Sequence, residues 1–228
     1  MKVKFGALIV EGRGKINGWV ASRNRGGSYF RTKVTPINPQ TSYQVAIRAR
    51  LAAISSGWGS LTAAQRTAWN AAVGDFAKTD VFGDLKNPSG FNLYQRLNNN
   101  LIACSKAAIT SPPMLTAVPT MSSLSLAVGV GAGTVILTYG PAIPADIAVK
   151  VFATAPMSAG KNFVKSEYRL IDVIVTADSS PFDITTEYEA KFGDGYAAGQ
   201  KIFVKCVPVQ FPTGISGLGL SCSTIVVA

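Results

Sequence analysis

The stretch Lys201-Ile202-Phe203-Val204-Lys205-Cys206-Val207 alternates between two sides of an extended chain. Its second, fourth and sixth residues are apolar and would face one side, and the other four would face the opposite side. A period of two is typical of a β-strand that covers a core with one face. Leu218, Leu220 and Cys222 repeat the apolar side in the next run. We therefore predict two strands of an antiparallel sheet here.

Similar runs fill the chain from residue 111 to its end. Short strands at near-regular spacing, with turn-rich junctions such as Gly131-Ala132-Gly133 and Phe192-Gly193-Asp194-Gly195, indicate an antiparallel sandwich with no helix. The boundary that precedes it is Ser111-Pro112-Pro113. We predict a β-sandwich over residues 111–228, with strands at 122–128, 134–139, 146–155, 168–177, 181–188, 200–210 and 217–227.

Residues 37–110 change to a helical period and predict about three helices. Thr41 starts a capping pattern, followed by apolar residues at intervals of three and four: Tyr43, Ile47, Leu51, Ile54 and Trp58. We expect Gly57 and Gly59 to end this helix. A second helix follows Thr62 and runs to about Ala77, and Ser89 precedes a third, in which Asn98-Asn99-Asn100 is poor helix material.

Residues 1–36 predict a basic β-hairpin arm, so the whole chain is expected to be α+β. The strands would be 16–23 and 28–34, joined by Asn24-Arg25-Gly26-Gly27, whose Asn and Gly suit a tight turn. Pro36 and Pro39 would end the arm. A two-stranded hairpin is marginal alone, so it needs its own helices or a neighbouring subunit to pack on.

The net charge of +10 is concentrated in the first fifty residues. That segment has ten Lys and Arg against Glu11 alone, a net of +9, whereas residues 51–110 carry +2 and residues 111–228 carry −1. Such a field attracts acidic proteins, nucleic acid or anionic membranes. The candidate partner-binding residues are Arg13, Lys15, Trp19, Arg23, Arg25, Tyr29, Arg31, Lys33 and Arg48.

Aromatic residues among these cations leave two kinds of partner open. Stacking combined with phosphate neutralisation would suit nucleic acid. Alternatively, Trp19, Tyr29 and Phe30 would form the buried side of the hairpin while the arginines meet an acidic protein. We favour the protein partner, although alternation places Arg23 on the same side as Trp19.

Catalytic and cofactor motifs are weak in this sequence. The absence of His excludes the Ser-His-Asp triad and most zinc sites. The cluster Gly129-Val130-Gly131-Ala132-Gly133 lacks the Lys-Ser/Thr of a phosphate loop, so it is interpreted as a turn between strands. The carboxylates Asp178, Asp183, Glu187 and Glu189 match no calcium loop and are interpreted as a solvated face. We predict no enzyme activity, no metal site and no cofactor.

Targeting signals and disulfides are not expected either. The apolar run 7–10 is too short for a signal peptide, and the weakly polar stretch 124–137 is too short to span a bilayer. We therefore expect synthesis in the cytoplasm, where thiols stay reduced. Cys104, Cys206 and Cys222 are expected to be buried free thiols, although a Cys206–Cys222 bridge remains open if their strands are neighbours.

A set of motifs spans the first half of the chain. Its segments are Gly14–Arg31, Pro36, Asn38–Thr41, Gln44, Arg48, the Trp58…Leu61-Thr62…Gln65-Arg66…Trp69 pattern, and Gly90–Tyr94 with Leu97, Asn98, Asn100 and Leu101. This set resembles a family of poorly characterised proteins encoded in tailed-phage genomes. The second half is similar to fibronectin type III or immunoglobulin-like modules through Tyr196–Lys205 and the closing strand.

The phage resemblance implies a virion structural protein, made in the host cytoplasm, and it brings no catalytic residues. The expected role is capsid decoration or cementing in a symmetric, homo-oligomeric assembly, with the major capsid, portal or tail proteins as partners. A neck or tail component is the nearest alternative. Two others are a DNA-binding accessory protein that uses residues 1–50 and an adhesion module whose sandwich loops bind glycans.

Overall fold

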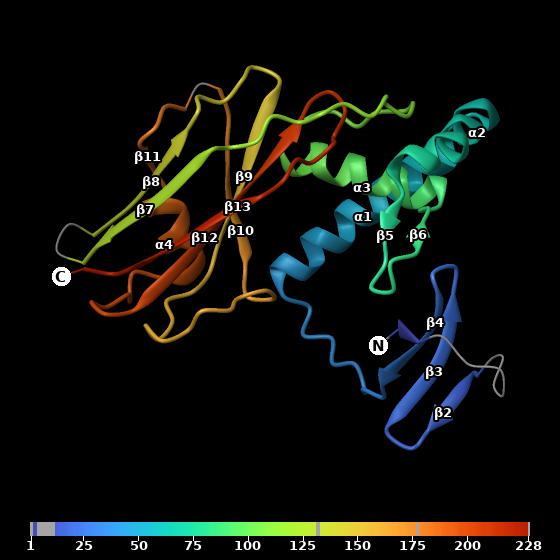
Figure 1. Ribbon diagram of the computed structural model, residues 1–228, viewed down its shortest axis with the longest axis horizontal. Helices are drawn as coiled ribbons and strands as arrows, with labels where there is room; N and C mark the ends of the chain where they lie inside the picture. The colour runs from blue at the N-terminus through green and yellow to red at the C-terminus, as the bar shows by residue number, and fades with distance from the viewer. Residues whose placement is uncertain (1, 4–11, 131–132, 177, 228) are drawn as a thin grey trace.

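The computed structural model describes residues 2–3, 12–130, 133–176 and 178–227. It is 26% helical and 32% strand, and every strand pair in the named sheets is antiparallel. The predicted α+β class is therefore confirmed. Figure 1 shows the arm, the helices and the C-terminal sheets in chain order. None of the described helices combines the length and apolarity needed to cross a membrane.

The arm is a sheet of four strands rather than a two-stranded hairpin. Its strands are β1 (Lys2–Val3), β2 (Gly14–Ile16), β3 (Trp19–Asn24) and β4 (Gly27–Thr32), in the order β1-β4-β3-β2. The predicted strand 16–23 was wrong because the chain reverses at Asn17-Gly18. Ile16 pairs with Trp19 across that reversal, and Asn17 has a φ of 49°, which Asn adopts more readily than most residues.

The central helices begin where the sequence predicts. They are α1 (Ser42–Ser60), α2 (Ala63–Ala71) with the 3₁₀ turn η1 (Ala72–Phe76), and α3 (Gly90–Ala103). Thr62 and Gln65 complete a reciprocal capping box. A short hairpin, β5 (Lys78–Thr79) and β6 (Leu85–Lys86), lies between η1 and α3.

The expectation that glycines end α1 was wrong. The helix continues to Ser60, and Gly57 within it lets α3 approach closely. A Cβ atom at position 57 would lie 2.8 Å from the Tyr94 hydroxyl of α3. Trp58 also packs against Tyr94, with ring centroids 5.4 Å apart.

Only the C-terminal half of α1 joins the helical core. Ile54 is buried there with Trp69, Leu93 and Leu97. The predicted apolar face is otherwise open, since Leu51 is 48% exposed. The reason is that α3 packs beside the end of α1 and not along its whole length, as Figure 1 shows.

Asn98 is a structural residue rather than a weak point of α3. Its side chain is fully buried, its Oδ1 accepts from the Ile109 amide at 2.6 Å, and its Nδ2 donates to the Ile109 carbonyl oxygen at 3.2 Å. The Asn98 side chain therefore makes, with the backbone of Ile109, the two hydrogen bonds that a neighbouring β-strand would otherwise provide.

Two antiparallel sheets enclose the C-terminal core. One has the order β11-β8-β7 and the other has the order β10-β9-β12-β13. The described strands are β7 (Ser123–Gly129), β8 (Thr134–Gly140), β9 (Ile147–Ala153), β10 (Arg169–Ile174), β11 (Phe182–Asp183), β12 (Lys201–Gln210) and β13 (Leu220–Ile225). Ile202, Val204 and Cys206 lie in this core, which confirms the predicted alternation in β12. In the next run Cys222 packs against the core, but Leu218 precedes β13 and is 79% exposed, so its predicted place on the apolar side was wrong.

The predicted strand at 181–188 was wrong, as was the expectation that no helix follows residue 111. After the two-residue β11 the chain forms α4 (Thr185–Phe192), and the expected hairpin turn at 192–195 instead follows that helix. Ile184 and Tyr188 are fully buried at a spacing of four residues. The Asp183 Oδ1 accepts from the Thr185 amide at 2.9 Å, which favours a helical start.

Cys104, Cys206 and Cys222 are free thiols, and Cys104 and Cys206 are buried as predicted, whereas Cys222 is only partly buried. Cys222 lies opposite Val204 and Cys206 lies opposite Leu220, so the two late cysteines are not directly paired across the strands. Burial raises the pKa of Cys206 to about 12 and that of Cys222 to about 11.

We expect all three thiols to resist alkylation in the folded chain at pH 8. A thiol whose pKa is about 12 is ionised on the order of one part in 10⁴ at that pH. Iodoacetamide and mass spectrometry, with and without guanidinium, would check this. Rapid labelling of Cys206 without denaturant would contradict the burial.

Asn98→Ala should lower the free energy of unfolding by about 2–4 kcal/mol, because it leaves two partly buried backbone groups of Ile109 without these partners. Asn99→Ala is the control, since Asn99 is exposed on the same helix. Asn99→Ala should change the free energy of unfolding by no more than about 0.7 kcal/mol, and it should stabilise the helix. Denaturation in urea measures both, and equal effects would remove the role given to Asn98.

Candidate docking surface

The strand register divides the arm sheet into two chemically different faces. Residues that pair directly across antiparallel strands share a face. Lys15 pairs with Val20, Val20 with Arg31, and Tyr29 with both Ser22 and Lys2. This basic face therefore carries Lys2, Lys15, Val20, Ser22, Tyr29 and Arg31. The opposite apolar face carries Ile16, Trp19, Ala21, Arg23 and Phe30.

The apolar face is incompletely covered. In the described part of the arm, Ala21 alone is buried. Ile16 is 62% exposed and Trp19 is 50% exposed. Since each large apolar side chain gains about 1.5–3 kcal/mol on full burial, this face retains free energy for a further contact.

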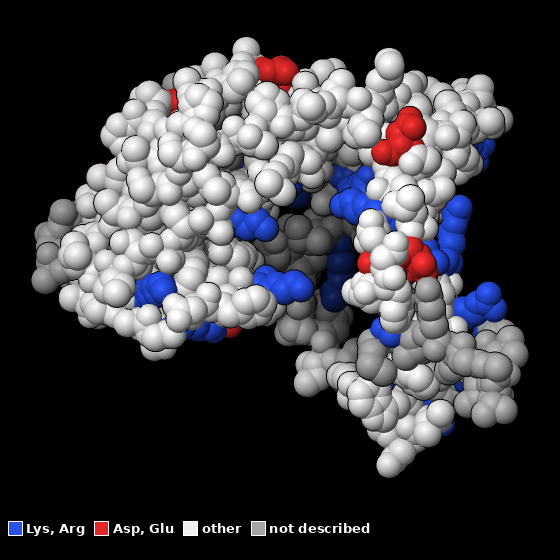
Figure 2. Space-filling view, viewed as in Figure 1, with Lys and Arg blue, Asp and Glu red and all other residues white. Residues whose placement is uncertain are grey.

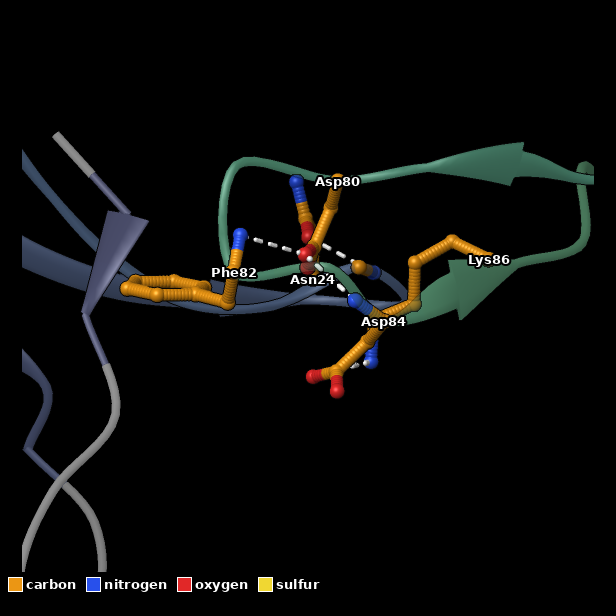
Figure 3. A network of polar contacts seen from close by, with 6 residues as sticks. Asn24, Asp80, Phe82, Asp84 and Lys86 are labelled. Atoms are coloured by element: carbon orange, nitrogen blue, oxygen red, sulfur yellow. Dashed lines mark hydrogen bonds and ion pairs between the residues drawn. The ribbon is translucent and has the colours of Figure 1, made fainter.

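The arm meets the remaining chain at the tip of its β3–β4 hairpin. Arg25 and Gly26 line a shallow cavity of about 270 Å³ with Lys86, Asn87 and other residues of the segment before α3. Figure 3 shows the tip residue Asn24 beside the loop that joins β5 and β6.

Asp80 organises the β5–β6 loop beside that tip. Its Oδ1 accepts from the amides of Phe82 at 2.8 Å and Asp84 at 3.2 Å (Figure 3). Partial desolvation raises the pKa of Asp80, but these hydrogen bonds and the charges of Lys2 and Lys86 outweigh it and leave the pKa lowered. The Asp80 carboxylate therefore already interacts with Lys2 of the arm within the same chain.

The structure brings together only part of the predicted partner-binding set. Lys15, Tyr29 and Arg31 share the basic face, whereas Trp19 and Arg23 lie on the opposite one. The remaining members are Arg25 at the hairpin tip, Arg13 before β2, Lys33 after β4, and Arg48 on α1.

Arg48 does not belong to the arm surface. Its Nη2 donates to the Asn38 Oδ1 at 2.8 Å and so ties the connecting segment to α1. Lys33 has a comparable backbone role, because its amide donates to the Gly18 carbonyl oxygen at 2.8 Å. Both side chains are exposed, so their predicted place among the partner contacts stays a prediction.

The carboxylates near residue 180 have local structural roles. The Asp178 Oδ2 accepts from the Val175 amide at 2.8 Å, and the Glu189 Oε1 accepts from the Tyr196 hydroxyl at 3.3 Å. The Asp183 Oδ1 accepts from the amide of Thr185, the first residue of α4. Across the described residues, no group of three or more His, Cys, Asp or Glu side chains could hold a metal ion.

Two surfaces were missed in the sequence. The first is the exposed start of α1, with Val45, Ile47 and Leu51. The helical spacing of apolar residues predicted a core face there, because spacing alone cannot distinguish a face that packs on the core from one that is exposed. The second is a cavity lined by Lys150, Lys165 and Lys205. The net charge of −1 over residues 111–228 concealed that local excess.

The comparisons with known proteins add no family. No family model, curated protein or solved structure matches the chain. The geometry of the described residues is therefore the basis for the functional proposal below.

Trp19→Ala should cost the isolated chain less than about 1 kcal/mol of unfolding free energy, because half of the indole is already exposed. Trp69→Ala should cost about 3–5 kcal/mol, since Trp69 is fully buried and its Nε1 donates to the Thr110 carbonyl oxygen. Chemical denaturation of both variants would check the contrast. A large loss in Trp19→Ala would show that the arm is already packed.

Proposed function

We propose that this chain is a non-enzymatic structural protein of a tailed-phage particle, and that it docks on an acidic neighbouring subunit through the arm. The observation that carries the proposal is the two-faced arm sheet, with cations on one face and a half-exposed Trp19 on the other. The particle itself is suggested by the sequence resemblance. Capsid decoration is the role we favour, with a neck or tail position as the alternative.

The geometry of the arm supports a protein partner over nucleic acid. A protein surface can cover the apolar face with its own apolar residues and oppose the basic face with carboxylates. Nucleic acid would satisfy Lys15 and Arg31 but would leave Ile16 and Trp19 in water. Burial of those side chains on a partner would also complete a sheet that is only marginally covered by its own chain.

The exposed start of α1 would enlarge this docking surface. Val45 and Ile47 are 48% and 38% exposed, and they follow the arm in the chain. An apolar area and a charged sheet that meet the same partner would combine affinity with electrostatic steering.

We also propose that the C-terminal sheets form a fibronectin type III-like sandwich. The support is the strand order: the first, second and fifth C-terminal strands form one sheet, and the third, fourth, sixth and seventh form the other. Both sheets contribute to a common core that includes Leu137 and Val151. Such a module would act as a spacer that projects from the particle while the arm holds it.

The double variant Lys15→Glu/Arg31→Glu should reduce incorporation into particles at least tenfold, because it reverses the charge of the basic face. Complementation of a deletion phage, followed by quantitative mass spectrometry of nuclease-treated particles, measures this. The control is Arg66→Glu, which removes an exposed cation from α2 and should incorporate normally.

Three results would contradict the proposal: absence of the wild-type chain from particles, normal incorporation of the double variant, or equal loss with Arg66→Glu. DNA binding is tested separately by a gel shift over a salt series. A sharp, salt-sensitive shift that disappears when residues 1–35 are deleted would favour the accessory-protein alternative.

A further inference from the structure

A second basic site lies away from the arm, between the sheet β10-β9-β12-β13 and the segment before β10. It is a cavity of about 270 Å³, lined by three lysines and by the apolar or aromatic residues Phe152, Tyr168 and Val207. The lysines are Lys150 on β9, Lys205 on β12, and Lys165 in the segment that precedes β10. Figure 2 shows Lys and Arg on both sides of the hollow between the C-terminal sheets and the helices.

Two of the three lysines are held in place by the fold. The Lys150 Nζ donates to the Asn100 Oδ1 of α3 at 2.8 Å. The stem of Lys205 passes close to Gly219, where a Cβ atom would lie 2.8 Å from the Lys205 Cε. A charged group that is already oriented loses less conformational entropy when it binds a ligand.

The charges of this site lack acidic partners among the described residues. The ion pairs found there are Lys86–Asp84 and Lys161–Glu167, and neither includes a lysine of the cavity. Burial also lowers the pKa of Lys150. Three amines in a concave surface without a carboxylate are costly, and an anionic ligand would offset that cost.

A neighbouring cavity extends the site along α3. It is lined by Lys78, Arg96 and Asn100, and it shares Ser216 with the first cavity. Arg96 stacks over Phe76, 5.6 Å from the ring centroid. Asp75 also lines this second cavity. A ligand of mixed character fits both cavities better than a polyphosphate, because a continuous row of phosphates would place one beside that carboxylate.

We propose that the lysine cavity binds an acidic peptide segment of a partner protein, with its carboxylates on Lys150, Lys165 and Lys205 and its apolar groups on Phe152 and Val207. The choice of an acidic protein rests on the proposed function, but the residues are separate from the arm. The site would hold the C-terminal sheets against the same neighbour that the arm contacts.

Fluorescence anisotropy of the full chain with a labelled fifteen-residue peptide that repeats Glu-Glu-Leu five times tests this site. At 0.15 M salt, Lys150→Gln and Lys205→Gln should each weaken binding about tenfold. Gly219→Ala keeps the charge but displaces the Lys205 stem, so it should also weaken binding. Arg66→Gln on α2 is the control and should bind within about twofold of wild type. The arm double variant Lys15→Gln/Arg31→Gln is measured beside it, to separate peptide binding at the arm from peptide binding at the cavity. Circular dichroism confirms the fold of each variant.

A labelled ten-nucleotide oligothymidylate of similar charge is the competing probe. Tighter binding of the oligonucleotide than of the peptide would overturn the proposal, as would no peptide binding below about 1 mM. Loss of peptide binding in the arm variant alone would also overturn it while leaving the proposed function intact. Peptide binding at the cavity together with normal particle incorporation of Lys15→Glu/Arg31→Glu would support this site and remove the arm proposal. If Lys150→Gln fails to fold, Lys165→Gln, at an exposed position, replaces it.

Discussion

The side chain of Asn100 joins the helices to the C-terminal sheets. Its Nδ2 donates to the Gly214 carbonyl oxygen at 2.8 Å, and its Oδ1 accepts from the Lys150 Nζ at the same distance. Ile215, the next residue along, packs into the helical core. These contacts cross the proline-marked boundary predicted at 111–113, so α3 and the sheet β10-β9-β12-β13 stabilise one another. The arm lies outside this arrangement and meets it through a hairpin tip.

Much of the fold could be predicted from local sequence signals, because helix caps and strand alternation are local properties. Thr62 with Gln65 and the alternation around Val204 both gave the right element. The incorrect predictions came from places where two local signals competed or where a tertiary contact decided the element. Asn17-Gly18 was a turn signal inside a β-rich run, and Tyr188 lies on a helix because its ring fills the core between two sheets.

The candidate site was predicted in its location and only partly in its arrangement. Net charge by segment pointed to the arm, yet only strand register could place Lys15 and Arg31 together and Trp19 on the opposite face. Lys150 and Lys205 could not be paired from sequence, since they stand 55 positions apart and meet only because β9 and β12 are neighbours. Charge counts over long segments conceal such clusters.

Hydrogen–deuterium exchange of the chain alone and in the assembled particle tests most directly whether the arm is a docking element. If the arm docks on a partner, β2–β4 should exchange fast in the isolated chain, and residues 14–32 should be strongly protected in the particle. The buried strands β9 and β12 should change little. Equal exchange of the arm in both states would contradict it, because an arm that gains no protection has no partner surface.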